Sequence, residues 1–473
     1  MPEIFAIVTI SGLSEGTHWL ILLAQSAAFI ISVAIILRLA HEKRAPSNIF
    51  AWSLLLLFMP LVGVPLYLMF GGRKIRRLVG EKVKILKMAR AAARKAGIFE
   101  DPCCAISGNK VTLLKDGVEA YRAFCKEIDH AKESIHIATF ILGNDSVGRS
   151  IVRRLASRAK AGVQVRLLID ALGSIYAPAS ALRLLRKAGG QVHYFIPLSP
   201  FVAKVSANLR NHRKIAIFDN VRAIVGGQNM DRRFLSPTYS KTLFADLGLC
   251  VEGPAVAAMT SVFVGDWAFA GKHDVQSLTS LLDKIPPVCG QSDIEVIASG
   301  PDVEGDLLWE RIISLVQEAR ASIVIVTPYF IPDEVLLRSL IIKAHAGRNV
   351  RIIVPETSNH FFVDLARDRF LRQMHAQGIE ILFYKKRMLH AKLIIVDGRY
   401  AISGSANIDP RSFFVNFEIG FVHSSPSDLK GFADWMDGDL LPRCIPYARS
   451  RKARQTRLRL LGENLAHLLT PLL

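Results

Sequence analysis

The chain has 473 residues, of which 51% are hydrophobic, and its formal net charge at pH 7 is +19. This length allows two or three domains with a substantial core, while the positive mean hydropathy is high for an enzyme that is soluble throughout. Its six cysteines have no CxxC spacing and no nearby histidine pairs, which argues against a zinc site and a disulfide framework.

Two apolar segments near the N-terminus account for the high hydropathy. Residues 19–37 and 49–70 contain no charged residue, and each is close to the ~20 residues that a helix needs to cross a bilayer core. A signal peptide fits the first segment poorly, because residues 1–18 contain two glutamates and no lysine or arginine. We therefore predict that residues 1–72 form a membrane anchor with two apolar helices.

The second apolar segment is either transmembrane or re-entrant. Pro60, Gly63 and Pro65 interrupt it, and proline is unfavourable inside a helix. Two full spans would place the basic connector around Lys43 outside, against the rule that positive residues mark the cytoplasmic side. A re-entrant segment removes this conflict, and in either case everything after Phe70 is expected in the cytoplasm.

The excess positive charge is concentrated in two runs. Residues 73–95 follow the second apolar segment, residues 443–459 lie near the C-terminus, and the middle of the chain is nearly neutral. Basic residues beside a membrane segment attract anionic headgroups, by roughly 1 kcal/mol each, whereas a nucleic-acid enzyme concentrates its charge around the cleft. Faces that serve only solubility are the alternative. The helical apolar spacing of residues 458–469 fits either a membrane-surface helix or a terminal helix packed on the core.

Two stretches in the soluble part of the chain resemble each other. Residues 131–170 and 319–355 each read as an apolar strand, an amphipathic helix, an Ala-Gly stop and a second β-branched strand. Glycine after the last turn ends a helix, and strands that alternate with helices indicate βαβ units. We therefore predict an α/β fold with two tandem repeats. The expected divisions are an anchor (1–72), a basic juxtamembrane linker (73–108), the repeats (109–285 and 286–440) and a basic amphipathic C-terminal segment (441–473).

A polar motif occurs once in each repeat. The stretch RNHRKIAIFDNVRAIVGGQN, residues 210–229, aligns with MLHAKLIIVDGRYAISGSAN, residues 388–407. The matched pairs are His212 and His390, Lys214 and Lys392, Asp219 and Asp397, Gly226 and Gly404, and Asn229 and Asn407. Because side chains alternate on an extended strand, the histidine and lysine of each copy project together. The repetition indicates that the two copies form one composite site.

These residue types suit a phosphate diester better than a metal. Lysine beside imidazole brings a repelling charge and no lone pair, but lysine and asparagine can hold phosphate oxygens while histidine attacks phosphorus or donates a proton. Two copies allow one imidazole to act as the nucleophile and the other to protonate the leaving alkoxide. Asp219 and Asp397, at the strand ends, are expected to brace the backbone. Ser405 offers a possible hydroxyl contact to phosphate that Gly227 of the first copy lacks.

Each histidine would also gain from a carboxylate on its other nitrogen, which fixes the tautomer. One candidate lies downstream of each motif in a strand-like context. Asp246 comes 34 residues after His212, and Glu418 comes 28 residues after His390. We therefore assign each carboxylate to the histidine of its own repeat, with an ordinary acid at a strand edge as the alternative.

The pattern HxKx4D followed by glycine and asparagine, present twice, resembles the signature of the phospholipase D superfamily. Nearly all of residues 20–473 is similar to bacterial cardiolipin synthases, through AWSLLLLFMPLVGVPLYLMFGGRK, LRNHRK, DPRSFFVNFE and the ending LLTPLL. The resemblance implies that both motifs meet across a pseudo-twofold axis in one catalytic unit. It also implies that His212 is the phosphohistidine nucleophile, that His390 is the general acid, and that no metal or other cofactor is used.

The resemblance implies a phosphatidyltransferase in a bacterial inner membrane, multi-pass, with its catalytic part on the cytoplasmic side. It would make cardiolipin and glycerol from two phosphatidylglycerol molecules, and its expected partners are that lipid and other anionic lipids. Water, another alcohol or another donor lipid would give a hydrolase or a different transferase on the same fold. The neutral middle of the chain disfavours a nuclease and nucleic-acid binding, and the two intact motifs disfavour a non-catalytic scaffold.

Overall fold

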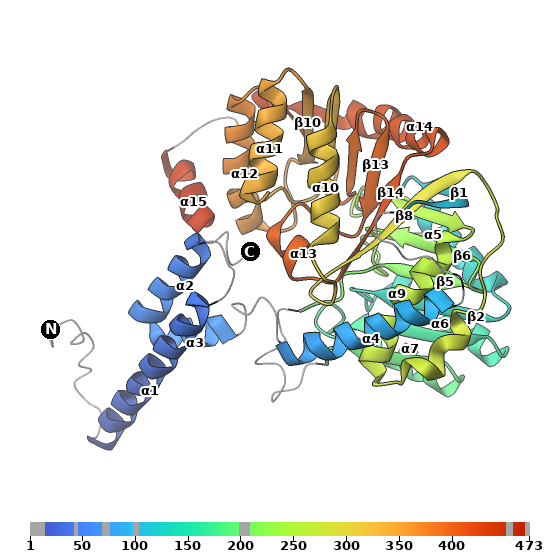
Figure 1. Cartoon of the computed structure of the whole chain (residues 1–473), viewed down its shortest axis with the longest axis horizontal. Helices are drawn as coiled ribbons and strands as arrows, with labels where there is room; N and C mark the ends of the chain where they lie inside the picture. The colour runs from blue at the N-terminus through green and yellow to red at the C-terminus, as the bar shows by residue number, and fades with distance from the viewer. Residues whose placement is uncertain are drawn as a thin grey trace. The chain divides into compact units, whose positions relative to one another are not determined.

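A computed structural model describes residues 15–41, 46–68, 76–95, 97, 104–197, 209–450 and 457–468. The chain divides into two compact units. The smaller one contains the helices before Gly72, and the larger one contains the rest of the described residues (Figure 1).

The N-terminal unit consists of α1 (Glu15–Ala40), α2 (Pro46–Phe58) and α3 (Pro60–Leu66). Within the described residues, one helix is long and apolar enough to cross a membrane, at Trp19–Ala40, with a mean hydropathy of 2.6. Leu39, Trp52 and Leu56 form a small buried cluster that joins α1 to α2. Length and composition thus fit membrane association of this unit.

The second apolar segment is not one continuous helix, and of its two readings the full membrane span is not confirmed. Its helix breaks at Met59, where φ is −136° and ψ is 61°. The next residue is Pro60, which lacks an N–H and disfavours the helical conformation of the residue before it. The result is a helix of 13 residues followed by one of seven, and neither has the length of a membrane span.

The larger unit is built on one 15-stranded sheet. The first half contributes β1 (Ile106–Leu114), β2 (Ser134–Thr139), β3 (Gln164–Asp170), β4 (Gln191–Phe195), β5 (Ile215–Phe218), β6 (Arg222–Gly226) and β7 (Gly248–Glu252). The second contributes β8 (Ser292–Ser299), β9 (Ser322–Val326), β10 (Asn349–Pro355), β11 (Glu380–Tyr384), β12 (Leu393–Val396), β13 (Tyr400–Gly404), β14 (Glu418–His423) and β15 (Cys444–Pro446).

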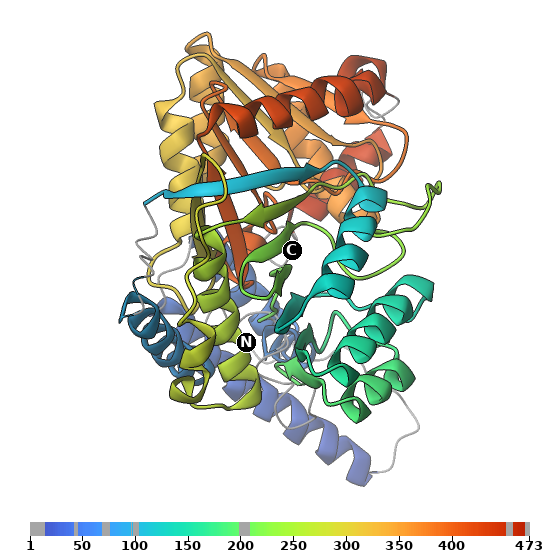
Figure 2. The same cartoon turned by 90° about the vertical axis from the view of Figure 1, so that its right-hand side faces the viewer.

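The strand order reveals the internal duplication. It runs β15-β11-β10-β9-β12-β13-β14-β8-β1-β7-β6-β5-β2-β3-β4, so apart from β15 the sequence of strands reads the same outward from the β8–β1 pair in both directions (Figure 2). β2 and β3 are parallel, as are β9 and β10. The predicted α/β fold with two tandem repeats is therefore confirmed.

Helices cover the sheet as the amphipathic patterns predict. They are α5 (Gly117–His130), α6 (Ser146–Lys160), α7 (Ala179–Lys187), α9 (Ala255–Gly271), α10 (Leu307–Glu318), α11 (Glu334–His345), α12 (Phe361–Ala376), α13 (Pro410–Phe414) and α14 (Pro426–Trp435). The two crossover helices, α6 and α11, end just before Gly162 and Gly347, whose φ values are +92° and +78°. Glycine adopts this left-handed conformation without strain, which explains both Ala-Gly stops.

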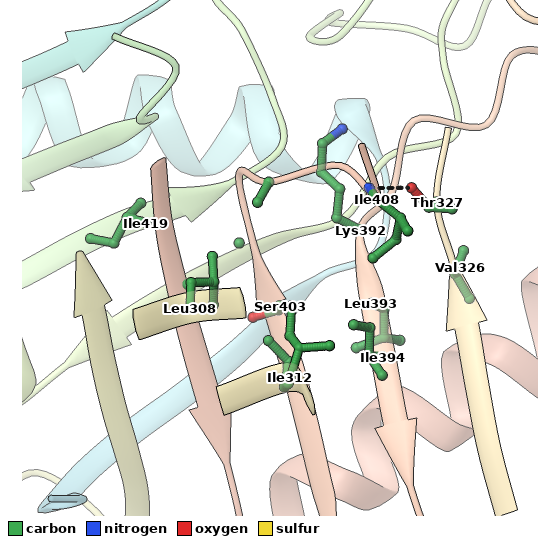
Figure 3. A pocket seen from close by; sticks show the side chains of 14 residues that line it. Leu308, Ile312, Val326, Thr327, Lys392, Leu393, Ile394, Ser403, Ile408 and Ile419 are labelled. Atoms are coloured by element: carbon green, nitrogen blue, oxygen red, sulfur yellow. Dashed lines mark hydrogen bonds between the residues drawn. The ribbon is translucent and has the colours of Figure 1, made fainter. Parts of the chain in front are cut away.

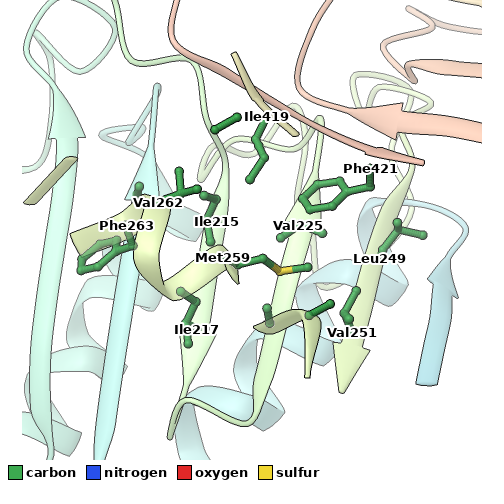
Figure 4. Packing of buried hydrophobic residues seen from close by; sticks show 14 of the residues in the cluster. Ile215, Ile217, Val225, Leu249, Val251, Met259, Val262, Phe263, Ile419 and Phe421 are labelled. Carbon is green, nitrogen blue, oxygen red and sulfur yellow. The ribbon is translucent and has the colours of Figure 1, made fainter. Parts of the chain in front are cut away.

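The core helix α9 lies between the two repeats. This helix is apolar, and most of its side chains are buried inside the protein. Figure 4 shows Met259 of α9 close to Ile217 and Val225 of the first repeat, with Phe421 of the second repeat on the same cluster. A shared core of this kind makes the two repeats one folding unit.

Helix α4 (Arg76–Lys95) lies in the stretch that was expected to be a basic linker, and it packs against α9. Leu86, Ala89 and Ala93 on one face are buried, while several basic residues on the other face are exposed. Lys82 is an exception, because it is 1% exposed and pairs with Asp266 of α9 at 2.7 Å and with Asp302. Its charge is therefore not available to lipid headgroups.

The C-terminal helix α15 (Arg457–Leu468) packs on α12. Arg459 of α15 donates to Asp368 of α12 at 2.7 Å. Glu463 of α15 is 1% exposed and forms an ion pair with Arg372 of α12. Of the two readings of this segment, the described residues fit a helix packed on the core.

Candidate active site

The two motif histidines lie just before β5 and β12, and each is held by the opposite repeat. The backbone N–H of His212 donates to the carbonyl of Phe417 at 2.9 Å, and that of His390 donates to the carbonyl of Ala245 at 2.7 Å. Phe417 and Ala245 each immediately precede a carboxylate, Glu418 and Asp246 respectively. These backbone contacts bring both motifs into one site between the repeats.

Each histidine binds the carboxylate of the other repeat, which corrects the sequence-based assignment. Nδ1 of His212 lies 2.9 Å from Oε1 of Glu418, and Nδ1 of His390 lies 2.7 Å from Oδ2 of Asp246. Both carboxylates are fully buried, whereas the histidine side chains are 12% and 8% exposed. The pairing crosses because each motif runs alongside the start of the other repeat's acid-bearing segment, a neighbourhood that spacing along the chain does not reveal.

The pairing with Glu418 fixes the tautomer of His212. Burial raises the pKa of Glu418, but His212, Lys214 and the Ser405 hydroxyl outweigh burial, so that the pKa is lowered overall. An ionised carboxylate only accepts hydrogen bonds, so Nδ1 carries the hydrogen and Nε2 keeps its lone pair. A nucleophile and a proton carrier both require a free Nε2 of this kind.

The crossed pairing predicts a selective effect on the tautomer. In ¹⁵N-histidine spectra assigned with His212→Ala and His390→Ala, Glu418→Gln should shift the ring nitrogens of His212, and Asp246→Asn those of His390. Each change is also expected to lower activity, by up to about 10⁴-fold, as replacing the carboxylate that orients a catalytic histidine by its amide does. If Glu418→Gln instead shifts the ring nitrogens of His390, and Asp246→Asn those of His212, each carboxylate binds the histidine of its own repeat.

Two lysines border the histidines. Nζ of Lys214 donates to the carbonyl of His212 at 2.6 Å. Nζ of Lys392 lies 2.6 Å from the carbonyl of His390, 2.9 Å from its Nδ1 and 3.3 Å from its Nε2. Figure 3 shows Lys392 extending away from the apolar side chains of Leu308, Ile312 and Ile394, with its ammonium at the end of the strand. The two ammonium groups are placed to neutralise an anionic group at the histidines.

Burial lowers the pKa of all four groups. The pKa of His212 falls to about 4 and that of His390 to about 3, while the pKa of Lys214 falls to about 7 and that of Lys392 to about 8. Near pH 7 both imidazoles are therefore neutral. Binding an anionic phosphodiester favours the charged forms, so the imidazole that acts as the acid takes up its proton with the substrate.

The lowered lysine pKa values predict the alkaline limb of the pH profile. A lysine is charged below its pKa, so raising the pH through 7 to 8 should remove the charges that hold the phosphate. The expected result is a fall in kcat/KM of about tenfold per pH unit between pH 7 and 8, and of about a hundredfold per pH unit above pH 8, where both lysines lose their protons. Lys214→Arg keeps its charge and should move the descending limb to higher pH. A profile that is flat from pH 6 to 9 would contradict this.

The two asparagines lie in the same region as the lysines. The amide oxygen of Asn229 accepts from the backbone N–H of Ile141 at 3.1 Å, which leaves its NH₂ group as the end that can donate to a phosphate. The amide oxygen of Asn407 is buried and has no partner within the described residues. The role of both side chains in binding a phosphate stays a prediction.

The motif aspartates lie at the far ends of β5 and β12 from the histidines, so they are not part of the site despite their place in the motif. The carboxylate of Asp219 accepts from the backbone N–H groups of residues 132–134, at 2.7 to 3.1 Å. Asp397 accepts from those of residues 320–322, at 2.7 to 2.8 Å. Each braces the start of the antiparallel neighbour of its own strand, β2 for Asp219 and β9 for Asp397, as their position predicts.

The difference between Ser405 and Gly227 has a structural explanation. The Ser405 hydroxyl is buried, donates to Glu418 and accepts from the N–H of Ile419, so it positions the carboxylate and does not offer the expected phosphate contact. At Gly227 a Cβ atom would lie 2.6 Å from Oδ1 of Asp246. The first repeat therefore needs glycine where the second has serine.

A buried ionic network behind His212 was missed from the sequence. Arg213 donates to Asp266 at 2.7 Å, to the carbonyl of Glu418 at 3.0 Å and to the carbonyl of Ser299 at 3.1 Å. Asn211 also donates to Asp266, at 2.9 Å. A signal was present, since Asp266 is the one charged residue within the apolar helix α9. Among the described residues, no group of three histidine, cysteine or acidic side chains could hold a metal ion.

Comparison with known proteins agrees with this architecture. The family model described as cardiolipin synthase, PLD-like domain, matches residues 124–267 and 312–440. A phospholipase D-nuclease N-terminal family matches residues 27–72. In fold, the chain is similar to phosphatidylserine synthase of Haemophilus influenzae, with a TM-score of 0.63 and 14% sequence identity over 80% of this chain and all of that one.

Two curated relatives extend over most of the chain. The cardiolipin synthase of Oceanobacillus iheyensis is 33% identical over 425 residues, which cover 84% of this chain and 88% of that protein. The major cardiolipin synthase ClsA of Bacillus subtilis is 31% identical over 478 residues, which cover 95% and 98%. With both repeats matched and the similarity spanning nearly the full length, the chain belongs to the phospholipase D-like family of cardiolipin synthases.

Proposed function

We propose that the protein joins two phosphatidylglycerol molecules to give cardiolipin and glycerol. The observation that carries this proposal is the pair of imidazoles, each with a buried carboxylate on Nδ1 and a lysine nearby, in a chain of this family. Such a pair suits a two-step displacement at phosphorus, which needs a nucleophile and an acid that later becomes a base.

In the first step, Nε2 of His212 attacks the phosphorus of the donor lipid. The bond from phosphorus to the headgroup glycerol oxygen breaks, and His390 gives that oxygen its proton, so that glycerol leaves. Lys214, Lys392 and the two motif asparagines stabilise the charge on the non-bridging oxygens.

In the second step, His390 removes the proton from a free hydroxyl of another phosphatidylglycerol. The resulting oxygen attacks phosphorus, the bond from phosphorus to His212 breaks, and cardiolipin is released. Glu418 keeps His212 in the attacking tautomer, and Asp246 stabilises His390 when it carries the additional proton.

The N-terminal unit supports a proposal for where the reaction takes place. We propose that residues 1–72 anchor the protein in a bacterial inner membrane, with α1 spanning and the segment broken at Met59 re-entrant. Residues after Phe70 then lie on the cytoplasmic side, in accord with their positive charge. The catalytic part comprises two phospholipase D-like repeats, 109–285 and 286–440, with 73–108 leading into it and 441–473 following it. Anchoring raises the effective concentration of both lipid substrates.

The proposal is tested by incubating the purified, detergent-solubilised full chain with labelled phosphatidylglycerol and separating the lipids. Cardiolipin together with an equal amount of glycerol is the expected result. Phosphatidic acid as the sole lipid product would make the protein a hydrolase that uses water as the acceptor. Replacing phosphatidylglycerol by phosphatidylethanolamine as the donor tests the preference for the headgroup.

A further inference from the structure

A cavity of about 740 Å³ opens beside the His390–Asp246 pair and is lined by both repeats. Ala245 forms part of its wall, and the carbonyl of this same residue accepts the backbone hydrogen bond from His390. The loop that leads from β11 to His390 forms another part, with Tyr384, Lys386 and Arg387. The cavity therefore shares a wall with one half of the site.

Two residues that line the cavity differ from their counterparts across the pseudo-twofold axis. Ala245 corresponds to Phe417, since each accepts the N–H of a motif histidine. On the Phe417 side, Nζ of Lys82 lies 4.2 Å from the centre of the Phe417 ring and 5.7 Å from that of Phe195. Alanine in place of phenylalanine leaves room on the other side.

The second difference supplies a buried hydroxyl. Tyr384 ends β11 as Phe195 ends β4, with Pro355 and Asp170 as their equivalent neighbours. The Tyr384 side chain is 1% exposed, and its hydroxyl has no hydrogen-bond partner among the described residues; the same holds for the buried Nε of Arg387. Leaving buried polar groups unpaired is unfavourable, so both groups favour a polar ligand in the cavity that their residues line.

The charge of the cavity specifies an anion. Five cationic side chains line it, from Lys115, Lys241, Lys386, Arg387 and Arg443, against two carboxylates, Asp116 and Asp439. Both carboxylates already have partners. Asp116 caps α5 and accepts from the Tyr239 hydroxyl at 2.6 Å, and Asp439 lies 3.5 Å from Arg443. The cationic side chains that line the cavity therefore exceed the carboxylates, and the excess can pair with a bound anion.

We propose that this cavity binds the phosphate of the acceptor phosphatidylglycerol while its free hydroxyl lies at His390. The inference rests on the proposed function. Only the three carbons of glycerol separate the reacting hydroxyl of the acceptor from its own phosphate, so a phosphate held beside His390 delivers that hydroxyl to the base. Arg387 and the Tyr384 hydroxyl bind the phosphate oxygens. Water carries no phosphate, so the cavity does not help water to bind at His390. The cavity therefore favours transfer to the acceptor lipid over hydrolysis.

The test uses the ratio of cardiolipin to phosphatidic acid formed by the full chain in vesicles of phosphatidylglycerol and phosphatidylcholine. Arg387→Met is expected to lower this ratio about tenfold and to raise the KM for phosphatidylglycerol in transfer. Tyr384→Phe removes only the hydroxyl, at a position whose counterpart is already phenylalanine, and should lower the ratio about threefold. Lys160→Ala, an equal loss of charge on the exposed end of α6, should leave the ratio unchanged.

An unchanged ratio in both variants would overturn the proposal, as would an equal loss of both products, which indicates a structural role. Inorganic phosphate distinguishes a soluble ligand from a lipid. If millimolar phosphate alters the wild-type rate but not that of Arg387→Met, and the product ratio is insensitive to the substitution, the cavity holds a free anion and the proposal fails. A wild-type protein that releases no glycerol would refute the proposed function itself, before the cavity is tested.

Discussion

Replacing His212 or His390 by alanine is expected to lower the rate of cardiolipin formation by about a thousandfold or more. His212 supplies the bond to phosphorus in the proposed reaction, and His390 supplies and removes the proton. General acid–base catalysis alone contributes about 10²- to 10⁴-fold, and the loss of a covalent nucleophile commonly exceeds this. The measurement is the initial rate of labelled cardiolipin formation by the solubilised full chain.

His130→Ala is the matched control, since His130 is an exposed histidine whose ring nitrogen contacts only its own helix, at the carbonyl of Lys126. A lipid analogue with a p-nitrophenol leaving group separates the two roles, because nitrophenol leaves without being protonated. His390→Ala should then still release a burst of nitrophenol, and His212→Ala should not. A burst retained by His212→Ala but lost by His390→Ala would exchange the roles of the two residues.

Replacing Lys82 by methionine is expected to destabilise the protein by about 3–5 kcal/mol, the usual cost of removing one partner from a buried ion pair. In the network of Lys82, Arg213, Asp266 and Asp302, all four side chains are at most 1% exposed. Two cations balance two carboxylates, so removing Lys82 leaves one buried carboxylate uncompensated. The change should appear as a lower midpoint of thermal unfolding in detergent.

Lys84→Met, on an exposed position of the same helix, is the control and should change the midpoint little. Combining Lys82→Met with Asp302→Asn restores the balance of charge and should recover part of the lost stability. If the single variant melts like the wild type, the network does not hold α4 in place. Activity should fall together with stability, because Arg213 also binds the carbonyl of Glu418.

The candidate catalytic residues stand out in the sequence because polar side chains recur at one spacing in apolar surroundings. His212 with Lys214 and His390 with Lys392 each lie before a short apolar strand, and the βαβ pattern before each motif predicts an α/β repeat. The Ala-Gly stops behaved as expected because glycine alone adopts a left-handed conformation freely.

The partners of these residues were not predictable in the same way. The assignment of Asp246 and Glu418 depends on which strand ends meet in space, and spacing along one repeat carries no information about the other. Helix α4 was read as a linker because its basic residues dominate its composition, although Lys82 faces inward among them. The second apolar segment was long enough to span a membrane, but the single residue Pro60 decides where its helix ends.

The crossed carboxylates also bear on how such a chain can evolve. A single free repeat would contain a histidine without its acid and an acid without its histidine, so it could react only as a symmetric pair of copies. Joining two copies in one chain removes the dependence on concentration and lets the halves become unequal. One such difference is Ala245 in the first repeat, where the second repeat has Phe417. The duplicated chain can thus treat two chemically identical lipids differently, one as the molecule to be cut and the other as the molecule to be extended.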